Sequence, residues 1–248
     1  MSGHSKWSTI KRKKAKVDAK RGKIFTKIIK EITIAAKQGG GDPEGNPRLR
    51  SAILEAKSAN MPQDNIDRAI KKGTGDLPGV SYEEVSYEGY GPEGVAVLVD
   101  VVTDNKNRTT AELKHIFSKN GGSIGSPNCV AWMFDRKGVI AVSAKPEEED
   151  QIMEVAMEEG AEDIYPVDDG FEIYTSVEDF IRIKEDLESK INISSAELSM
   201  IPKNPTEQKD TGKAGKILKF LESLEDHDDV QNVYANVDIP EEILNKIE

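Results

Sequence analysis

The sequence of 248 residues contains a single cysteine, Cys129, and only three histidines. One cysteine cannot form a disulfide within the chain, which is typical of a reducing compartment and excludes a small scaffold held together by disulfides. The histidines, His4, His115 and His227, are more than a hundred residues apart, and none lies near a second metal-binding side chain in a zinc-site spacing. We therefore expect no structural metal site.

Long hydrophobic runs are also missing. The most apolar stretch, Val95–Val102, is interrupted by Asp100 and is much shorter than the roughly 20 residues that cross a bilayer. The basic N-terminus is not followed by the apolar segment of a signal peptide. Apolar residues still make up 37% of the chain, which is enough for a folded core. The sequence predicts a folded, cytoplasmic protein that does not enter a membrane.

No set of residues stands out as catalytic. The stretch 89–94 has the GxGxxG spacing of a dinucleotide site, but it contains Pro92 and leads into a strand pattern, so a hairpin turn is the better interpretation. Acidic clusters such as Glu147–Asp150 could hold Mg²⁺ or transfer protons, but solvated helix ends explain them better. Cys129 has no basic neighbour and is expected to be an inert thiol. We predict a non-enzyme with no cofactor, no metal and no small-molecule substrate.

Charge is distributed very unevenly along the chain. The whole chain has 34 Lys+Arg against 45 Asp+Glu, a net charge of −11. Residues 1–75 hold 18 basic and 7 acidic residues, a net of +11, which leaves 16 and 38, a net of −22, for residues 76–248. A cationic segment on an acidic body is typical of a protein that binds a polyanion. The acidic total therefore does not exclude nucleic acid as a partner.

Hydrophobic periodicity predicts three helices near the N-terminus. Apolar residues of the segment 24–38 repeat on one helical face, and three glycines end it. Asn46 and Pro47 suit the N-cap and the first position of a second helix. A third helix is expected over residues 63–72, with Gly73 as its C-cap. Short breaks between these helices indicate a small bundle.

The remainder of the chain alternates between strand and helix patterns. Thr109 and Glu112 have the spacing of a capping box, which predicts a helix over residues 109–120. From residue 138 the order is strand, helix, strand, strand, helix, strand, as in a ferredoxin-like domain. The expected strands are 82–90, 94–102, 122–126, 131–136, 138–143, 162–167, 171–175, 195–201 and 229–237, and the further helices are 147–159, 177–190 and 212–225.

These patterns predict a multi-domain protein of the α and β class: a three-helix bundle and two ferredoxin-like α+β domains, one inserted in the other. The helix and strand at the C-terminal end belong to no complete βαββαβ unit of adjacent elements. Together with the strand 94–102, the helix 109–120 and the strand 122–126 they nearly make up a second such unit. The expected domains are a basic bundle with an N-terminal arm at 1–76, a discontinuous α+β domain at 77–130 and 206–248, and an inserted ferredoxin-like domain at 131–205.

The cationic arm is the strongest functional signal. Lysine and arginine neutralise phosphates, and an aromatic ring such as that of Trp7 can stack on an unpaired base. A solvated arm, or one that contacts a membrane surface, is the alternative. The predicted nucleic-acid-binding residues of the arm and bundle are Lys6, Trp7, Lys11, Arg12, Lys13, Lys14, Lys16, Lys20, Arg21, Lys23, Arg48, Arg50, Lys71 and Lys72.

A second candidate contact is the polar segment between the strand 94–102 and the helix 109–120. Free backbone N–H groups at a helix N-terminus can bind phosphate, so this segment could contact nucleic acid. A polar turn with an N-cap is an equally good interpretation. The candidate residues are Asn105, Asn107, Arg108 and Thr109.

Several motifs make the chain similar to the YebC family over nearly its whole length. They are Gly3-His4-Ser5-Lys6-Trp7, Arg21-Gly22-Lys23-x-Phe25, Ala35-Ala36, Asp42-Pro43, Asn46-Pro47-Arg48-Leu49-Arg50, Asn60-Met61-Pro62, Asp64-Asn65-Ile66, Ile70-Lys71-Lys72-Gly73, Thr103-Asp104-Asn105-x-Asn107-Arg108-Thr109 and Val130 to Gly138.

The resemblance implies the same three-domain fold and a role in gene expression. Family members include a mitochondrial translational activator of cytochrome c oxidase, and many are labelled probable transcriptional regulators. We favour a non-catalytic translation factor that binds ribosomal or transfer RNA on the ribosome, with a DNA-binding transcriptional regulator as the alternative. The chain departs from the family at Pro127-Asn128-Cys129, where a Gly-Ser pair is usual, so a contact made by that turn is in doubt.

Overall fold

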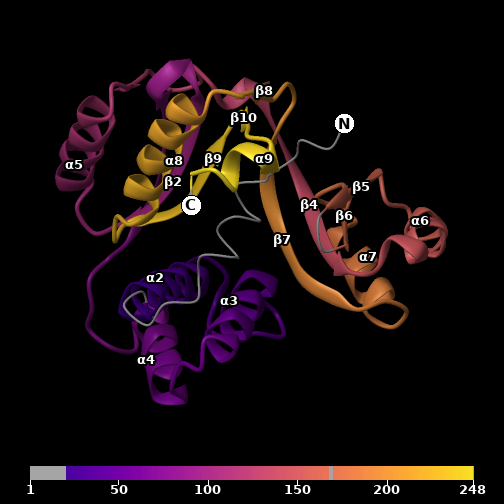
Figure 1. Ribbon diagram of the computed structural model, residues 1–248. Coiled ribbons are helices and arrows are strands. Elements are labelled where there is room, and N and C mark those ends of the chain that lie inside the picture. Colours follow the sequence, from indigo (N-terminus) through magenta and orange to yellow (C-terminus); the bar gives the residue numbers. More distant parts are fainter. Residues whose placement is uncertain (1–20, 168–169, 248) are drawn as a thin grey trace. The chain divides into compact units, whose positions relative to one another are not determined.

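The computed structural model describes residues 21–167 and 170–247, with α2 as the first described helix (Figure 1). The described chain forms two compact units. One unit takes in residues 132–206, and the other takes in the segments before and after them. The domain boundaries expected from the sequence remain a prediction, whereas the expected fold class, N-terminal helices followed by antiparallel α+β sheets, is confirmed.

Three helices form the bundle: α2 (Arg21–Gly39), α3 (Pro47–Ser58) and α4 (Gln63–Thr74). Their apolar faces meet in a core around Ile28, Ile32, Leu49 and Ile66. Asn46 caps α3 as expected, because its side-chain oxygen accepts a hydrogen bond from the Leu49 amide at 3.1 Å. The Asn46 amide group also donates to backbone carbonyls at the end of α2, which fixes the turn between the two helices.

The end of α4 differs from the sequence prediction. Gly73 lies inside the helix, and the C-cap is Gly75, which has a left-handed φ of 88°. A Cβ on Gly73 would lie 2.4 Å from the carbonyl oxygen of Thr33 on α2. Gly73 therefore allows the two helices to approach closely, and the sequence pattern gave this glycine the wrong role.

The second part of this unit is a four-stranded antiparallel sheet in the order β3-β1-β2-β9. Figure 1 shows α5 and α8 on one face of it. Its core includes Val99, Leu113 and Phe117, and the Phe117 ring packs edge-on against Phe220 with 5.0 Å between centroids. The elements are β1 (Glu83–Tyr90), η2 (Pro92–Gly94), β2 (Ala96–Thr103), α5 (Lys106–Lys119), β3 (Ser123–Ile124), α8 (Thr211–Glu225) and β9 (Val230–Ala235).

The GxGxxG stretch connects β1 to β2 as an antiparallel hairpin, which confirms the turn interpretation. By contrast, the capping-box prediction is wrong, because α5 begins three residues earlier, at Lys106. Its N-cap is Asn105, whose side chain accepts from the Arg108 amide. Thr109 is buried instead and takes part in a polar cluster described below.

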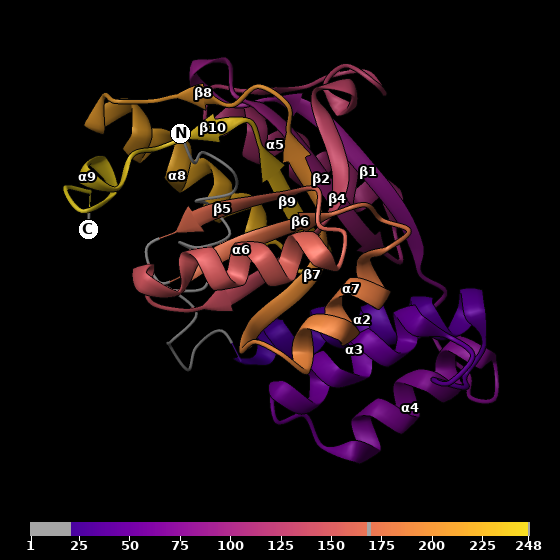
Figure 2. The ribbon, with the colours of Figure 1, turned by 90° about the vertical axis from the view of Figure 1, so that its right-hand side faces the viewer.

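The other unit has a sheet in the order β5-β6-β4-β7, and Figure 2 shows α6 and α7 over the same face. Two strands expected at 131–136 and 138–143 are parts of one strand, because β4 continues through Gly138 in register with both β6 and β7. The elements are η3 (Ala131–Met133), β4 (Phe134–Ser143), η4 (Pro146–Glu148), α6 (Glu149–Glu158), β5 (Asp163–Val167), β6 (Gly170–Thr175), α7 (Phe180–Glu188) and β7 (Ile193–Pro202).

The two four-stranded sheets have the same architecture with a different chain order. In the 132–206 unit the order along the chain is β4, α6, β5, β6, α7, β7. The corresponding elements of the other unit are, in the same sequence, β2, α5, β3, β1, α8 and β9. With these substitutions the sheet order β5-β6-β4-β7 becomes β3-β1-β2-β9. The strand that corresponds to β6 is therefore β1, which precedes the other three strands of its sheet along the chain.

The remaining short elements are β8 (Thr206–Glu207), which precedes α8, and β10 (Val237–Asp238) and α9 (Glu241–Leu244), which follow β9. β8 pairs with β10, and the Gln208 amide donates to the Asp238 carbonyl at 2.8 Å. None of the helices in the described residues is long and apolar enough to cross a membrane.

We predict that Gly73→Ala destabilises the bundle by about 1–3 kcal/mol, because the added methyl overlaps the Thr33 carbonyl and a helix must shift. Gly22→Ala is the matched control: Gly22 lies in α2 with open space around its Cα, so alanine should be neutral or slightly stabilising. Urea denaturation followed by far-UV circular dichroism measures both changes. Equal stability of the two variants would contradict the role given to Gly73.

Candidate nucleic-acid interface

Most of the predicted arm falls outside the described residues. This applies to Lys6, Trp7, Lys11, Arg12, Lys13, Lys14, Lys16 and Lys20, whose contacts stay predictions. Arg21 is the first residue of α2.

A row of lysines on α2 contacts the end of α8 and the loop that follows it. Lys23 Nζ donates to the carbonyl of Asp226 at 2.9 Å, and Lys27 Nζ donates to that of Glu225 at 2.6 Å. The last carbonyls of a helix have no intrahelical partner and form the negative end of its dipole, so they attract cations. Lys23, a predicted nucleic-acid contact, is thus held against an acidic segment of the same chain.

The strongest contact in this row is a buried ion pair between Lys30 and Asp229. The Lys30 ammonium lies 2.5 Å from Asp229 Oδ1 and also donates to the Asp228 carbonyl at 2.9 Å. Only 6% of Lys30 and 3% of Asp229 is exposed. A buried charge needs a partner and further hydrogen bonds to offset the loss of water, and both conditions are met here.

The second oxygen of Asp229 binds the start of α5. Asp229 Oδ2 accepts hydrogen bonds from Thr109 Oγ1 at 2.6 Å and from Arg108 Nη2 at 2.8 Å. Thr103 Oγ1, at the end of β2, lies 3.2 Å from the same oxygen. One carboxylate therefore connects the bundle, the sheet and the segment before β9, a role that spacing in the sequence could not indicate because its partners are about 120 to 199 residues away.

The environment of Asp229 lowers the pKa of its carboxyl group well below the usual range. Burial alone would raise this pKa, but hydrogen bonds from Lys30, Thr109 and Arg108 to the ionised form outweigh the loss of solvation. The Asp229 carboxylate is therefore charged at any ordinary pH. It supplies the negative charge that faces Lys30 and Arg108.

The polar segment before α5 contributes to this cluster rather than forming an open anion site. Asn105 is the N-cap, Arg108 pairs with Asp104 and Asp229, and Thr109 is buried. The Asn107 side chain is exposed and forms no hydrogen bond with any other described residue. The N-cap interpretation accounts for Asn105 and Thr109, while a nucleic-acid contact by Arg108 and Asn107 stays a prediction.

Among the described residues, Glu112, His227 and Asp229 are the only group of three or more potential metal ligands that come together. His227 Nδ1 accepts from the Asp229 backbone amide at 3.1 Å, so the neutral ring has its proton on Nε2, which lies 2.9 Å from Glu112. The Asp229 oxygens already bind two cations. These groups thus have protein partners, and nearby positive charge disfavours a metal ion.

The predicted nucleic-acid-binding cations of the bundle differ in exposure and in whether they are already paired within the chain. Arg48 binds Glu31 through Nε at 2.7 Å and Nη2 at 3.0 Å, and it also pairs with Glu84 on β1, so it connects α2, α3 and the sheet. Arg50 is half-buried near the Pro43 carbonyl. Lys71 and Lys72 are exposed in the last turn of α4. Sequence reasoning missed two further exposed cations of α3 and α4, Lys57 and Arg68.

Glu88 holds the loop in which the sequence departs from the family pattern. Its carboxylate, only 8% exposed, accepts from the amides of Asn128, Val130 and Ala131 at 2.6 to 2.8 Å. Burial raises the pKa of Glu88, but these three backbone donors outweigh it and lower the pKa overall. Asn128 has a left-handed φ of 67°. Apart from glycine, asparagine is one of the few residues that adopt this conformation.

The thiol of Cys129 lies in the same loop. Burial, together with the negative charge of Glu88, raises the pKa of this thiol. A raised pKa keeps the thiol protonated and poorly nucleophilic at neutral pH, in agreement with the expected inert cysteine.

The comparisons with known proteins agree with this architecture. Residues 5–76 match the model described as the TACO1/YebC protein N-terminal domain, and residues 82–237 match the TACO1/YebC second and third domain. Together these models cover most of the chain. The protein belongs to the TACO1/YebC family, which confirms the resemblance noted in the sequence.

Two relatives are similar over their whole length and are named probable transcriptional regulatory protein. The protein from Syntrophus aciditrophicus is 60% identical, covering 100% of this chain and 99% of its own, and that from Syntrophobacter fumaroxidans is 55% identical, covering 100% of both. The crystal structure of a conserved hypothetical protein, Aq1575 from Aquifex aeolicus, has a TM-score of 0.87 at 52% identity and covers 97% of this chain and 99% of its own.

We predict that Asp229→Asn lowers the free energy of unfolding by about 3–5 kcal/mol, because it leaves the buried Lys30 ammonium without its counter-charge. Asp228→Asn is the matched control. Its side chain is exposed and only its carbonyl contacts Lys30, so the effect should stay within about 0.5 kcal/mol. Chemical denaturation at pH 7 compares the two.

The stability that the Lys30–Asp229 pair contributes should depend on pH. Since the folded-state pKa of Asp229 is lowered, its stabilising contribution is complete above the unfolded pKa of about 4 and is lost as the pH falls below it, towards the folded pKa. The stability difference between wild type and Asp229→Asn should therefore shrink in acid. A difference that stayed constant from pH 7 to pH 2 would contradict this assignment.

We predict that Glu88→Gln releases the loop 125–131. The glutamine amide presents a donor where the backbone also presents donors, so at least one hydrogen bond is lost, at a cost of about 1–3 kcal/mol. Hydrogen exchange at Asn128, Val130 and Ala131 should speed up. Glu83→Gln, an exposed change on the same strand, should leave these amides protected.

Proposed function

We propose that this protein is a non-catalytic, nucleic-acid-binding regulator of gene expression, and that its ligand is ribosomal or transfer RNA on the ribosome. The observation that carries the proposal is the charge division: +11 in residues 1–75 and −22 in the rest. Only the N-terminal part attracts a phosphate backbone, and the acidic body repels it. The family membership and the regulatory names of the relatives support a role in gene expression.

The placement of charges on the bundle supports RNA more than a duplex DNA operator. A recognition helix inserts its N-terminal residues into the major groove. In α4 those residues include Asp64 and Asp67, which repel phosphates, whereas its cations Arg68, Lys71 and Lys72 lie towards the C-terminal end. The bundle is therefore suited to a phosphate surface rather than to base edges in a groove.

A DNA-binding transcriptional regulator is the second candidate. The observation that favours it is the name that the relatives bear, probable transcriptional regulatory protein. The chemistry of phosphate binding by the arm is the same for both ligands, so the choice between them depends on a direct comparison of RNA and DNA.

The role proposed for the acidic body is positional. The arm and the bundle anchor on RNA, and the ion-paired cluster around Asp229 holds the sheet of the same unit in a fixed relation to the anchor. Repulsion by the body then limits the orientations in which the bound protein can lie. No chemical step by the protein is required.

We predict a steep salt dependence of RNA binding. If six cations of the arm contact phosphates, log K should fall with log salt concentration with a slope of about −4 to −5. Reversing the charges of Lys11, Arg12, Lys13 and Lys14 to glutamate should reduce the slope by about three units and weaken binding strongly. Fluorescence anisotropy with a ribosomal RNA fragment, together with co-sedimentation with ribosomes at low salt, measures this.

The matched control reverses four exposed lysines of the acidic body, Lys114, Lys119, Lys216 and Lys219, which changes the net charge equally. It should leave the slope unchanged. Failure to co-sediment with ribosomes at low salt would contradict the RNA proposal. Tighter, sequence-selective binding to a promoter duplex than to RNA would favour the second candidate.

A further inference from the structure

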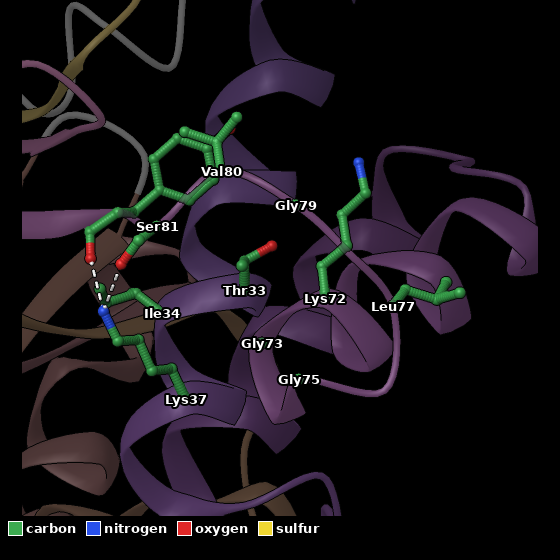
Figure 3. Close-up of a pocket in the computed structure, with 11 residues that line it drawn as sticks. Thr33, Ile34, Lys37, Lys72, Gly73, Gly75, Leu77, Gly79, Val80 and Ser81 are labelled. Carbon is green, nitrogen blue, oxygen red and sulfur yellow. Dashed lines mark hydrogen bonds between the residues drawn. The ribbon is translucent and has the colours of Figure 1, made fainter.

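A pocket of about 190 Å³ lies between α2, the end of α4 and the segment that leads to β1 (Figure 3). In Figure 3 the Thr33 side chain points from α2 into the space beside Lys72 and Val80. Leu77 lies on the same side as Lys72, at the start of the segment. All of these residues belong to one compact unit of the chain.

The walls of this pocket are held in place by specific contacts. Lys37 on α2 donates to Ser81 Oγ at 2.9 Å and to the Tyr82 carbonyl at 3.0 Å, which fixes one side of the segment. Gly75, with its left-handed φ, turns the chain at the end of α4, and the Leu77 amide donates back to the Lys71 carbonyl at 3.0 Å. The hollow is thus part of the fold rather than a gap beside a loose loop.

The lining combines apolar surface with one free cation. Leu77 and Val80 are 36% and 54% exposed, and both belong to the lining of the same pocket. Tyr82 adds an aromatic ring. The Lys72 side chain is exposed at the rim, and its ammonium forms no hydrogen bond or ion pair with any other described residue.

This combination matches one component of a nucleic acid. A nucleobase has a flat, apolar face that gains from contact with aliphatic and aromatic side chains, and it carries a phosphate that a lysine can neutralise. A paired base inside a duplex cannot enter a pocket, whereas a base in a single strand, loop or bulge can. The exposed cations Arg68 and Lys71 in the same helix would continue the phosphate path.

We propose that this pocket, which we call the α2/α4 pocket, binds one unpaired nucleotide of the RNA, with the base against the apolar lining that includes Leu77 and Val80 and the phosphate at Lys72. The inference rests on the proposed function, and it adds selectivity for unpaired over duplex RNA. The arm then supplies charge-dependent affinity, and the α2/α4 pocket determines which RNA conformation is bound.

The test compares three probes on the full-length chain: a single-stranded RNA of about 12 nucleotides, an RNA duplex of equal length, and inorganic polyphosphate, which has no bases. Leu77→Ser/Val80→Ser removes the apolar walls without changing charge. We expect about tenfold weaker binding of the single strand, and unchanged binding of the duplex and of polyphosphate. Both side chains are partly exposed, so the fold should persist, and thermal melting checks this.

The matched control is Leu54→Ser/Val177→Ser, two exposed apolar residues outside the pocket, which should leave all three affinities unchanged. Lys72→Gln should weaken binding of the single strand more than Lys57→Gln, an equal change on α3. If the pocket variant binds the single strand as tightly as wild type, the inference is wrong while the proposed function stands. If wild type binds none of the probes at low salt, the proposed function itself fails.

Discussion

The ion pair between Lys30 and Asp229 is the constraint on which the larger unit depends. It is buried, and it joins residues that are 199 positions apart in the chain. Asp229 could not be buried as a charge without Lys30, Arg108 and Thr109, and Lys30 could not be buried without Asp229. Such a pair contributes little net stability compared with a well-packed apolar pair, but it penalises every arrangement in which the partners are separated.

Contacts within the chain, this ion pair among them, also determine which cations are available to a ligand. Lys23, Lys27 and Lys30 lie against the carbonyls and carboxylate of the segment 225–229. Arg48 is occupied by Glu31 and Glu84, and Arg108 by Asp104 and Asp229. The net charge of +11 therefore overstates what a polyanion meets on the described part of the bundle. What remains is the cluster of exposed side chains on α3 and α4, in addition to whatever the arm supplies.

The sequence was sufficient where the information is local. Helical periodicity predicted α2, α3 and α8 to within a few residues, and Asn46-Pro47 identified the start of α3. Local rules failed where a distant residue decides the outcome. Thr109 has the spacing of an N-cap, but Asp229 draws it into the interior, and Gly73 has the position of a C-cap, but Thr33 on α2 requires a residue without a side chain.

The same distinction between local and distant information applies to the sheet β3-β1-β2-β9 and to the pocket. The sequence showed that the C-terminal helix and strand needed partners, but it could not show that β1 takes the place that β6 takes in the other sheet, because strand pairing depends on contacts between distant segments.

The α2/α4 pocket likewise depends on the close approach of two helices and on a turn at Gly75, neither of which is visible in a pattern of apolar residues. Composition could locate the charge of this protein, but only the fold shows where that charge is free and where it lies beside an apolar hollow. Charge alone gives affinity for any polyanion, whereas a free cation next to an apolar wall can distinguish one conformation of a nucleic acid from another.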